Sequence, residues 1–205
     1  VVLFVFGGLL NALGMTAPAR AMEQGLANLL GARSEGPVLA ALFAIVLIAL
    51  PILLLGIAGM LTASFTRREL SSSLDVVTRY SYALVPLGFG VWLAHYGFHL
   101  LTGVLTLIPV TQSAVLDLFG WPALGTPLWQ LTGMRPGLVF PIEIGVILMG
   151  AGGSLVLAYL ISERDYLESR LIATIPWAAV TIAITVAALW ITSQPMDMRA
   201  VAFPG

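Results

Sequence analysis

The stretch Val91-Trp92-Leu93-Ala94-His95-Tyr96-Gly97-Phe98-His99-Leu100 holds both histidines of the chain. It lies inside a run from residue 80 to residue 110 that carries no acidic or basic charge and is long enough to cross a bilayer as a helix. Residues four apart share one face of a helix, so the two imidazoles stand one turn apart. Lipid tails cannot hydrogen-bond an imidazole, and we therefore expect this face to lie against other helices or a wet cavity.

The composition around this stretch is that of a membrane protein. Of the 205 residues, 59% are hydrophobic and 9% are charged, whereas a soluble domain carries about 25% charged residues. The net charge of −1 gives no reason to expect a nucleic-acid partner. The chain has no cysteine, so by itself it can hold no disulfide and no iron–sulfur cluster. The composition predicts the lipid bilayer as its surroundings.

Apolar runs separated by polar turns predict an all-α fold, a polytopic transmembrane helical bundle of about five spans. The expected spans are residues 1–18, 37–66, 78–110, 138–161 and 171–192, within a single transmembrane domain over 1–205. The chain opens in an apolar run without a starting Met, and we expect it to be part of a longer polypeptide. Arginines in the short turns at 67–68 and 164–170 place those turns in the cytoplasm by the positive-inside rule.

A second ionisable group is expected at the depth of the histidines. Glu143 is the only carboxylate inside an expected span, about five residues from the outer end of that span. Asn11 lies at a similar depth in the first span. A buried carboxyl group is rarely left without a partner, so we expect Glu143 to meet His95 and His99 in the outer half of the membrane.

Three interpretations of this constellation stay open. The first is a proton-coupled quinone site, which needs proton acceptors beside a flat apolar slot. The second is a metal site formed by His95 and His99 with a carboxylate; haem is less favoured, because two histidines one turn apart on one helix cannot ligate both faces of one haem. The third is a structural clamp between helices. The candidate catalytic residues are His95, His99 and Glu143, and the candidate cofactor-binding residues are Asn11, Trp92 and Tyr96.

Two segments, residues 7–18 (GGLLNALGMTAP) and 86–103 (PLGFGVWLAHYGFHLLTG), resemble the membrane part of polyferredoxin-type proteins. These are bacterial 4Fe-4S membrane proteins grouped near the accessory subunits of nitrate and nitrous-oxide respiration, and they pass electrons between the quinone pool and redox partners. The cysteine motifs of that family have no counterpart here, so the resemblance assigns no cluster ligand. It implies a multi-pass protein of the bacterial inner (cytoplasmic) membrane.

These observations together predict a membrane subunit of a respiratory or photosynthetic-type redox assembly, packed against other membrane subunits, with a His/Glu site in the outer half of the membrane for quinone- and proton-coupled electron transfer. The sequence does not assign the cofactor; quinone is favoured over haem or a metal. One alternative is a non-catalytic anchor or assembly subunit. Another is a membrane protein or transporter that binds haem or a metal such as copper. In the anchor alternative we expect a large flat apolar face against partner helices, with the histidines packed and free of solvent.

Overall fold

The structure is a computed structural model that describes residues 1–66 and 72–196, and within these ranges the regular elements are all helical apart from one isolated bridge, Thr16 to Met196. The expectation of an all-α fold is confirmed. The elements in chain order are α1 (Val2–Leu13), α2 (Ala17–Leu30), α3 (Glu35–Ala44), the π-helical turn η1 (Ile45–Ala49), α4 (Leu50–Thr66), α5 (Ser73–Ser81), the 3₁₀ turn η2 (Tyr82–Leu84), α6 (Val85–Gly103), the 3₁₀ turn η3 (Val104–Thr106), α7 (Leu107–Phe119), α8 (Pro136–Asp165) and α9 (Arg170–Thr192).

Four helical stretches of the described chain are long and apolar enough to cross a membrane: Glu35–Thr66, Ser73–Phe119, Pro136–Asp165 and Arg170–Thr192. They overlap the last four expected spans. In the expected first span, 1–18, the structure has the shorter helix α1, whose 12 residues cover about 18 Å at 1.5 Å per residue. A hydrocarbon core of about 30 Å needs about 20 residues, and α1 is not among the four stretches of that length in the described residues.

Helix α1 also ends before the end of the expected first span, 1–18, which closes at Pro18. The helix ends at Leu13, and Pro18 occupies the second position of α2. Proline is favoured in the first helical turn, because its missing N–H would have no partner there and its φ angle is already helical. Pro18 therefore begins the next helix instead of stopping the previous one.

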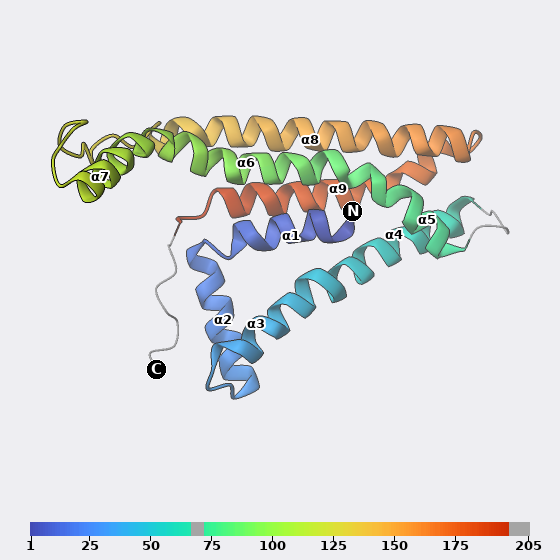
Figure 1. Ribbon diagram of the computed structural model, residues 1–205. Coiled ribbons are helices and arrows are strands. Elements are labelled where there is room, and N and C mark those ends of the chain that lie inside the picture. Colours follow the sequence, from blue (N-terminus) through green and yellow to red (C-terminus); the bar gives the residue numbers. More distant parts are fainter. Residues whose placement is uncertain (67–71, 197–205) are drawn as a thin grey trace.

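Helices α1, α6, α8 and α9 run side by side and enclose most of the core (Figure 1). Two glycines allow α6 and α8 to pack backbone against backbone. A Cβ added at Gly150 would lie 2.6 Å from the carbonyl oxygen of Pro86, and one added at Gly90 would lie 2.9 Å from the carbonyl oxygen of Val146. Small residues permit such close approach within membranes, where dispersion contacts drive helix association.

A proline bends the expected third span before the histidines. Pro86 has no N–H to donate to the carbonyl of Tyr82, and the chain there forms the 3₁₀ turn η2 between α5 and α6. The next amide, that of Leu87, donates instead to the hydroxyl of Ser154 on α8 at 3.0 Å. The bend is thus stabilised from the neighbouring helix.

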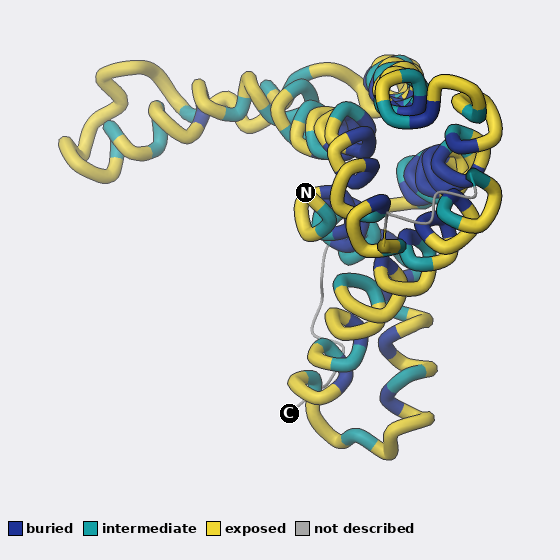
Figure 2. Tube along the Cα trace, turned by 90° about the vertical axis from the view of Figure 1, so that its right-hand side faces the viewer, coloured by how far each residue is buried: buried dark blue, intermediate teal, exposed yellow. Residues whose placement is uncertain are grey.

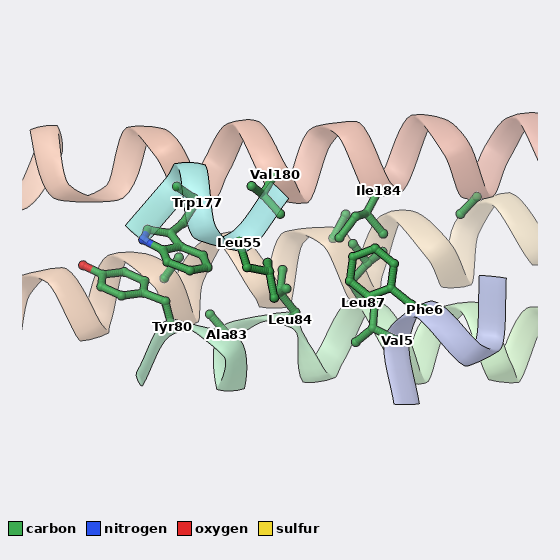
Figure 3. Close-up of a cluster of buried hydrophobic side chains, with 14 of the residues drawn as sticks. Val5, Phe6, Leu55, Tyr80, Ala83, Leu84, Leu87, Trp177, Val180 and Ile184 are labelled. Carbon is green, nitrogen blue, oxygen red and sulfur yellow. The ribbon is translucent and has the colours of Figure 1, made fainter. Parts of the chain in front are cut away.

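At the end of the bundle beside the turn between α8 and α9, residues 166–169, a buried polar network joins four helices. The ring of Tyr80 stacks on Trp177 with centroids 4.8 Å apart, and its hydroxyl lies 2.6 Å from the Ser162 hydroxyl. The indole N–H of Trp177 donates to Thr62 at 3.1 Å. Figure 3 shows the two rings against each other at one end of the core cluster. Outside it, Arg79 pairs with Asp165 at 3.0 Å. Arg67 and Arg68 lie outside the described residues.

Helices α3, η1 and α4 form one continuous stretch that diverges from the bundle. Its 32 residues cover about 48 Å, more than a bilayer core, and a stretch of that length crosses at a tilt. Figure 1 shows it running obliquely from α5 to α2, away from α1. The π-helical turn η1 comes just before Pro51, where the proline ring would clash with the carbonyl of Leu47. The departure from α-helical geometry near Pro51 therefore takes the form of a π-helical turn.

Candidate functional site

The histidine pair lies on the face of α6 that the sequence predicts. His95 is 5% exposed, and the ring of His99 stands 4.9 Å from it, centroid to centroid, at an angle of 84°. The Nε2 atoms of both rings are buried and have no hydrogen-bond partner in the protein. The two rings therefore make no clamp through Nε2 and keep this atom available for a ligand or a proton.

His95 shares a small cavity with Glu143. Both side chains line a hollow of about 20 Å³, and Glu143 is 6% exposed. A volume of this size is enough for about one water molecule. The remaining walls come from α1, α6, α9 and the chain on either side of the bridge between Thr16 and Met196: Leu9, Ala12, Thr16, Val91, Ala188, Ile191, Thr192, Gln194 and Met196.

The cavity ends where the chain after α1 meets the chain after α9. The amide of Ala17 donates to the carbonyl of Pro195 at 3.2 Å, beside the bridge between Thr16 and Met196. Thr16 and Gln194 bring polar atoms to this end. A carboxyl, an imidazole and space for one water form a group that can hold and pass on a proton, but the space is too small for a quinone ring.

A second, much larger hollow lies on the other side of α1. It measures about 550 Å³ and lies between α1 and the diverging α3–η1 stretch, with α2 and α6 also contributing walls. Its lining residues are Gly7, Leu10, Asn11, Gly14, Met15, Glu23, Leu39, Leu42, Phe43, Leu47 and Trp92. We call this hollow the α1–α3 groove. Binding sites for small organic molecules have volumes of about 300–1,000 Å³, with mostly apolar walls and a few polar groups, and the groove has these properties.

Helix α1 separates the two hollows, because one face of the helix lines the small cavity and another face lines the α1–α3 groove. Leu9 and Ala12 line the small cavity, whereas Gly7, Leu10 and Asn11 line the α1–α3 groove. Residues three and four apart share a face, so Asn11 points away from the Glu143 side. Asn11, a candidate cofactor-binding residue expected at the depth of the histidines, therefore lines a different hollow from His95 and Glu143.

Trp92 joins α6 to α1 at the wall of the groove. Its indole N–H donates to the carbonyl of Phe4 at 2.8 Å, and its ring stacks on Phe4 and on Tyr96, with centroids 6.1 and 5.2 Å away. The close approach depends on Gly8, where an added Cβ would lie 2.9 Å from the indole nitrogen. Tyr96 is 54% exposed and lines neither hollow, so it supports Trp92 from outside.

The described residues give limited support to a metal site. Over 1–66 and 72–196, no group of three or more His, Asp or Glu side chains lies close enough to hold a metal ion. Of the expected metal ligands, His95 and Glu143 line one small cavity. His99 contacts the ring of His95 but does not line that cavity. Metal or haem ligation by the two histidines stays a prediction.

One groove residue was not among the expected site residues. Glu23 on α2 is 7% exposed and lines the α1–α3 groove. In the sequence it lies in a polar connection, where a charged residue is typical of a solvated face. Its burial depends on α2 packing beside α3, which no local pattern predicts.

Comparisons with models of protein families, with curated proteins and with solved structures gave no match to this chain. The resemblance to the membrane part of polyferredoxin-type proteins therefore stays a prediction.

Proposed function

We propose that this chain is a membrane-embedded subunit of a bacterial inner-membrane redox assembly, in which the α1–α3 groove binds a quinone and the His95–Glu143 cavity exchanges its protons. The observation that carries the proposal is the groove itself, a ligand-sized apolar hollow in a fold that has helices long and apolar enough to cross a membrane. A proton-holding pair lies just across α1 from it. The two parts supply the two requirements of quinone chemistry, a slot for the ring and a place for protons.

The groove walls suit a flat ring that carries two carbonyl groups. The side-chain amide of Asn11 is a hydrogen-bond donor that a quinone oxygen can accept from. Trp92 already donates its indole N–H to Phe4, so toward a ligand it offers its ring for stacking. Phe43 and the leucines of α3 supply the apolar wall. A lipid-soluble ring with hydrogen-bond acceptors at its edge matches this set of contacts.

The proton requirement assigns roles to His95 and Glu143. Reduction of a quinone to a quinol takes up two electrons and two protons, and oxidation of the quinol returns both. In this proposal the electrons pass to or from a redox partner subunit, and the protons pass through the His95–Glu143 cavity. Trp92 and His95 are three residues apart on α6, one at each hollow, so a ligand against Trp92 lies one helical turn from the imidazole.

Filling the groove tests the proposal. A Cβ added at Gly7 meets no atom within 4 Å, so Gly7→Leu places a side chain in the groove without a clash at its base. Gly152 on α8 is equally unobstructed and is exposed, and Gly152→Leu is the matched control. Binding of a short-chain quinone is measured by titration calorimetry on the protein in lipid nanodiscs.

We expect saturable quinone binding to the unmodified protein, at least tenfold weaker binding to Gly7→Leu, and unchanged binding to Gly152→Leu. A tenfold loss corresponds to about 1.4 kcal/mol of binding free energy. Absence of saturable binding to the unmodified protein, or equal losses in both variants, would contradict a quinone site in the groove.

A second candidate function is a non-catalytic anchor, and one observation favours it. The stretch that forms one wall of the groove also has large apolar side chains on its exposed surface, among them Ile48, Ile52 and Leu53. A helix of a partner subunit packed on this stretch would bury them and cover the groove. In that case Gly7→Leu would weaken assembly with the partner, and neither the variant nor the unmodified protein would bind quinone. Co-purification of the assembly distinguishes the two candidates.

A further inference from the structure

An arm of the chain leaves the bundle at the end where α2 lies. This arm comprises residues 107–135, which are α7 and the loop after it. In Figure 1 it continues past the ends of α6 and α8, and Figure 2, turned by 90°, shows it extending sideways from the bundle. Its direction is therefore strongly inclined to the helices that cross the membrane.

The arm is a closed unit held by its own hydrogen bonds. The side chain of Gln112 on α7 donates to the carbonyl of Leu124 at 2.9 Å and accepts from the amide of Leu128 at 3.0 Å. At its base, the amide of Met134 donates to the carbonyl of Leu101 at 2.8 Å. These bonds fold the loop back along α7 and fix both to the end of α6. The arm is thus a folded unit with a fixed position on the end of α6.

The surface of the arm is apolar and aromatic. Leu118 is 77% exposed, and Phe119, Trp121 and Trp129 are each more than 60% exposed. In the sequence from 107 to 135 the charged residues are Asp117 and Arg135 alone. An exposed apolar surface of this extent is unfavourable in water and requires a covering.

We propose that the arm lies in the plane of the membrane and inserts Leu118, Phe119 and Trp121 at the boundary between headgroups and acyl chains. The arm begins at residue 107, near the end of the uncharged run from residue 80 to residue 110, which is long enough to cross the hydrocarbon core, so the arm begins close to the headgroups. Tryptophan and phenylalanine are the side chains preferred there. The inference does not depend on the proposed function.

The near absence of charge on the arm adds a further expectation. Interfacial helices that bind by electrostatic attraction carry several lysines or arginines for anionic lipids. The arm has one acidic and one basic residue, so its insertion depends on apolar burial. The depth of the arm should be the same in neutral and in anionic bilayers and should not change with salt.

The depth can be measured because the chain has no native cysteine. A fluorophore is attached to Leu118→Cys in the arm, to Met149→Cys, which is 71% exposed on α8, and to Glu168→Cys in the exposed turn before α9. The full chain is reconstituted in vesicles of neutral phospholipid. Quenching is compared for lipids with a spin label near the headgroup, lipids with a label deep in the acyl chain, and aqueous iodide.

We expect at least twofold stronger quenching of the Leu118→Cys probe by the shallow label than by the deep one, and little quenching by iodide. The Met149→Cys probe should respond to lipid labels and the Glu168→Cys probe to iodide alone. Iodide quenching of the Leu118→Cys probe at the level of Glu168→Cys would overturn the proposal. Protection of that probe from all three quenchers would also overturn it and would indicate a protein covering.

Discussion

Substitution of Gly150 by alanine tests whether α6 and α8 are held backbone against backbone. The added Cβ would lie 2.6 Å from the carbonyl oxygen of Pro86 and 3.1 Å from the Cα of Leu87, whereas ordinary contacts begin at 3.4 Å. Both obstructing atoms belong to the backbone, so no side-chain rotation relieves the overlap. The helices must separate locally by most of an ångström. Overpacking of this kind costs about 1–3 kcal/mol.

The matched control is Gly152→Ala, two residues along the same helix, where an added Cβ meets no atom within 4 Å. Alanine gains the same helix propensity at both positions, about 0.5–1 kcal/mol. The difference between the variants therefore isolates the packing cost. For a chain of this size, about 2 kcal/mol lowers the Tm by about 4–8 °C.

The assay is thermal unfolding of both variants and the unmodified protein in the same nanodiscs. We expect the Tm of Gly150→Ala to lie about 4–8 °C below that of Gly152→Ala. Equal Tm values would refute the reasoning, because α6 and α8 would then have space for a methyl group between them.

Two further predictions concern side chains on α5 and α6. Tyr80→Phe keeps the stacking on Trp177 but loses the 2.6 Å hydrogen bond to Ser162. The loss of about 1 kcal/mol should lower the Tm by about 2–4 °C. No change in Tm would mean that this hydroxyl contributes nothing to stability. His95→Ala should lower quinol-dependent electron transfer by the assembled complex at least tenfold with its subunits still present, whereas lost assembly with normal turnover in the remaining complexes would indicate a structural clamp.

Much of the fold follows from the sequence, because a membrane imposes helices on long apolar runs. The stretches near 37–66 and 138–161 lie within helical elements whose composition alone identifies them. The burial of His95 beside an exposed Tyr96 likewise follows from helical spacing around a polar stripe. These features depend on the local sequence pattern and on the requirement that backbone polar groups in lipid form their hydrogen bonds within helices.

The parts that the sequence did not predict depend on packing. Residue counts give the depth of Asn11, but its direction around α1 is set by how α1 meets α6, where Trp92 fills the space above Gly8. The α1–α3 groove needs α3 to diverge from α1, and no periodicity encodes that angle. Pro18 is compatible with the end of one helix or the start of the next, and only the structure distinguishes them.

The central claim is that a quinone occupies the α1–α3 groove, and photoaffinity labelling tests it most directly. Native membranes containing the whole assembly are illuminated with an azido-substituted quinone, and the modified residues are located by mass spectrometry. We expect labels on Leu10, Phe43 or Trp92, suppressed by excess unmodified quinone. Labelling confined to exposed residues such as Met149, or labelling that excess quinone leaves unchanged, would contradict this claim.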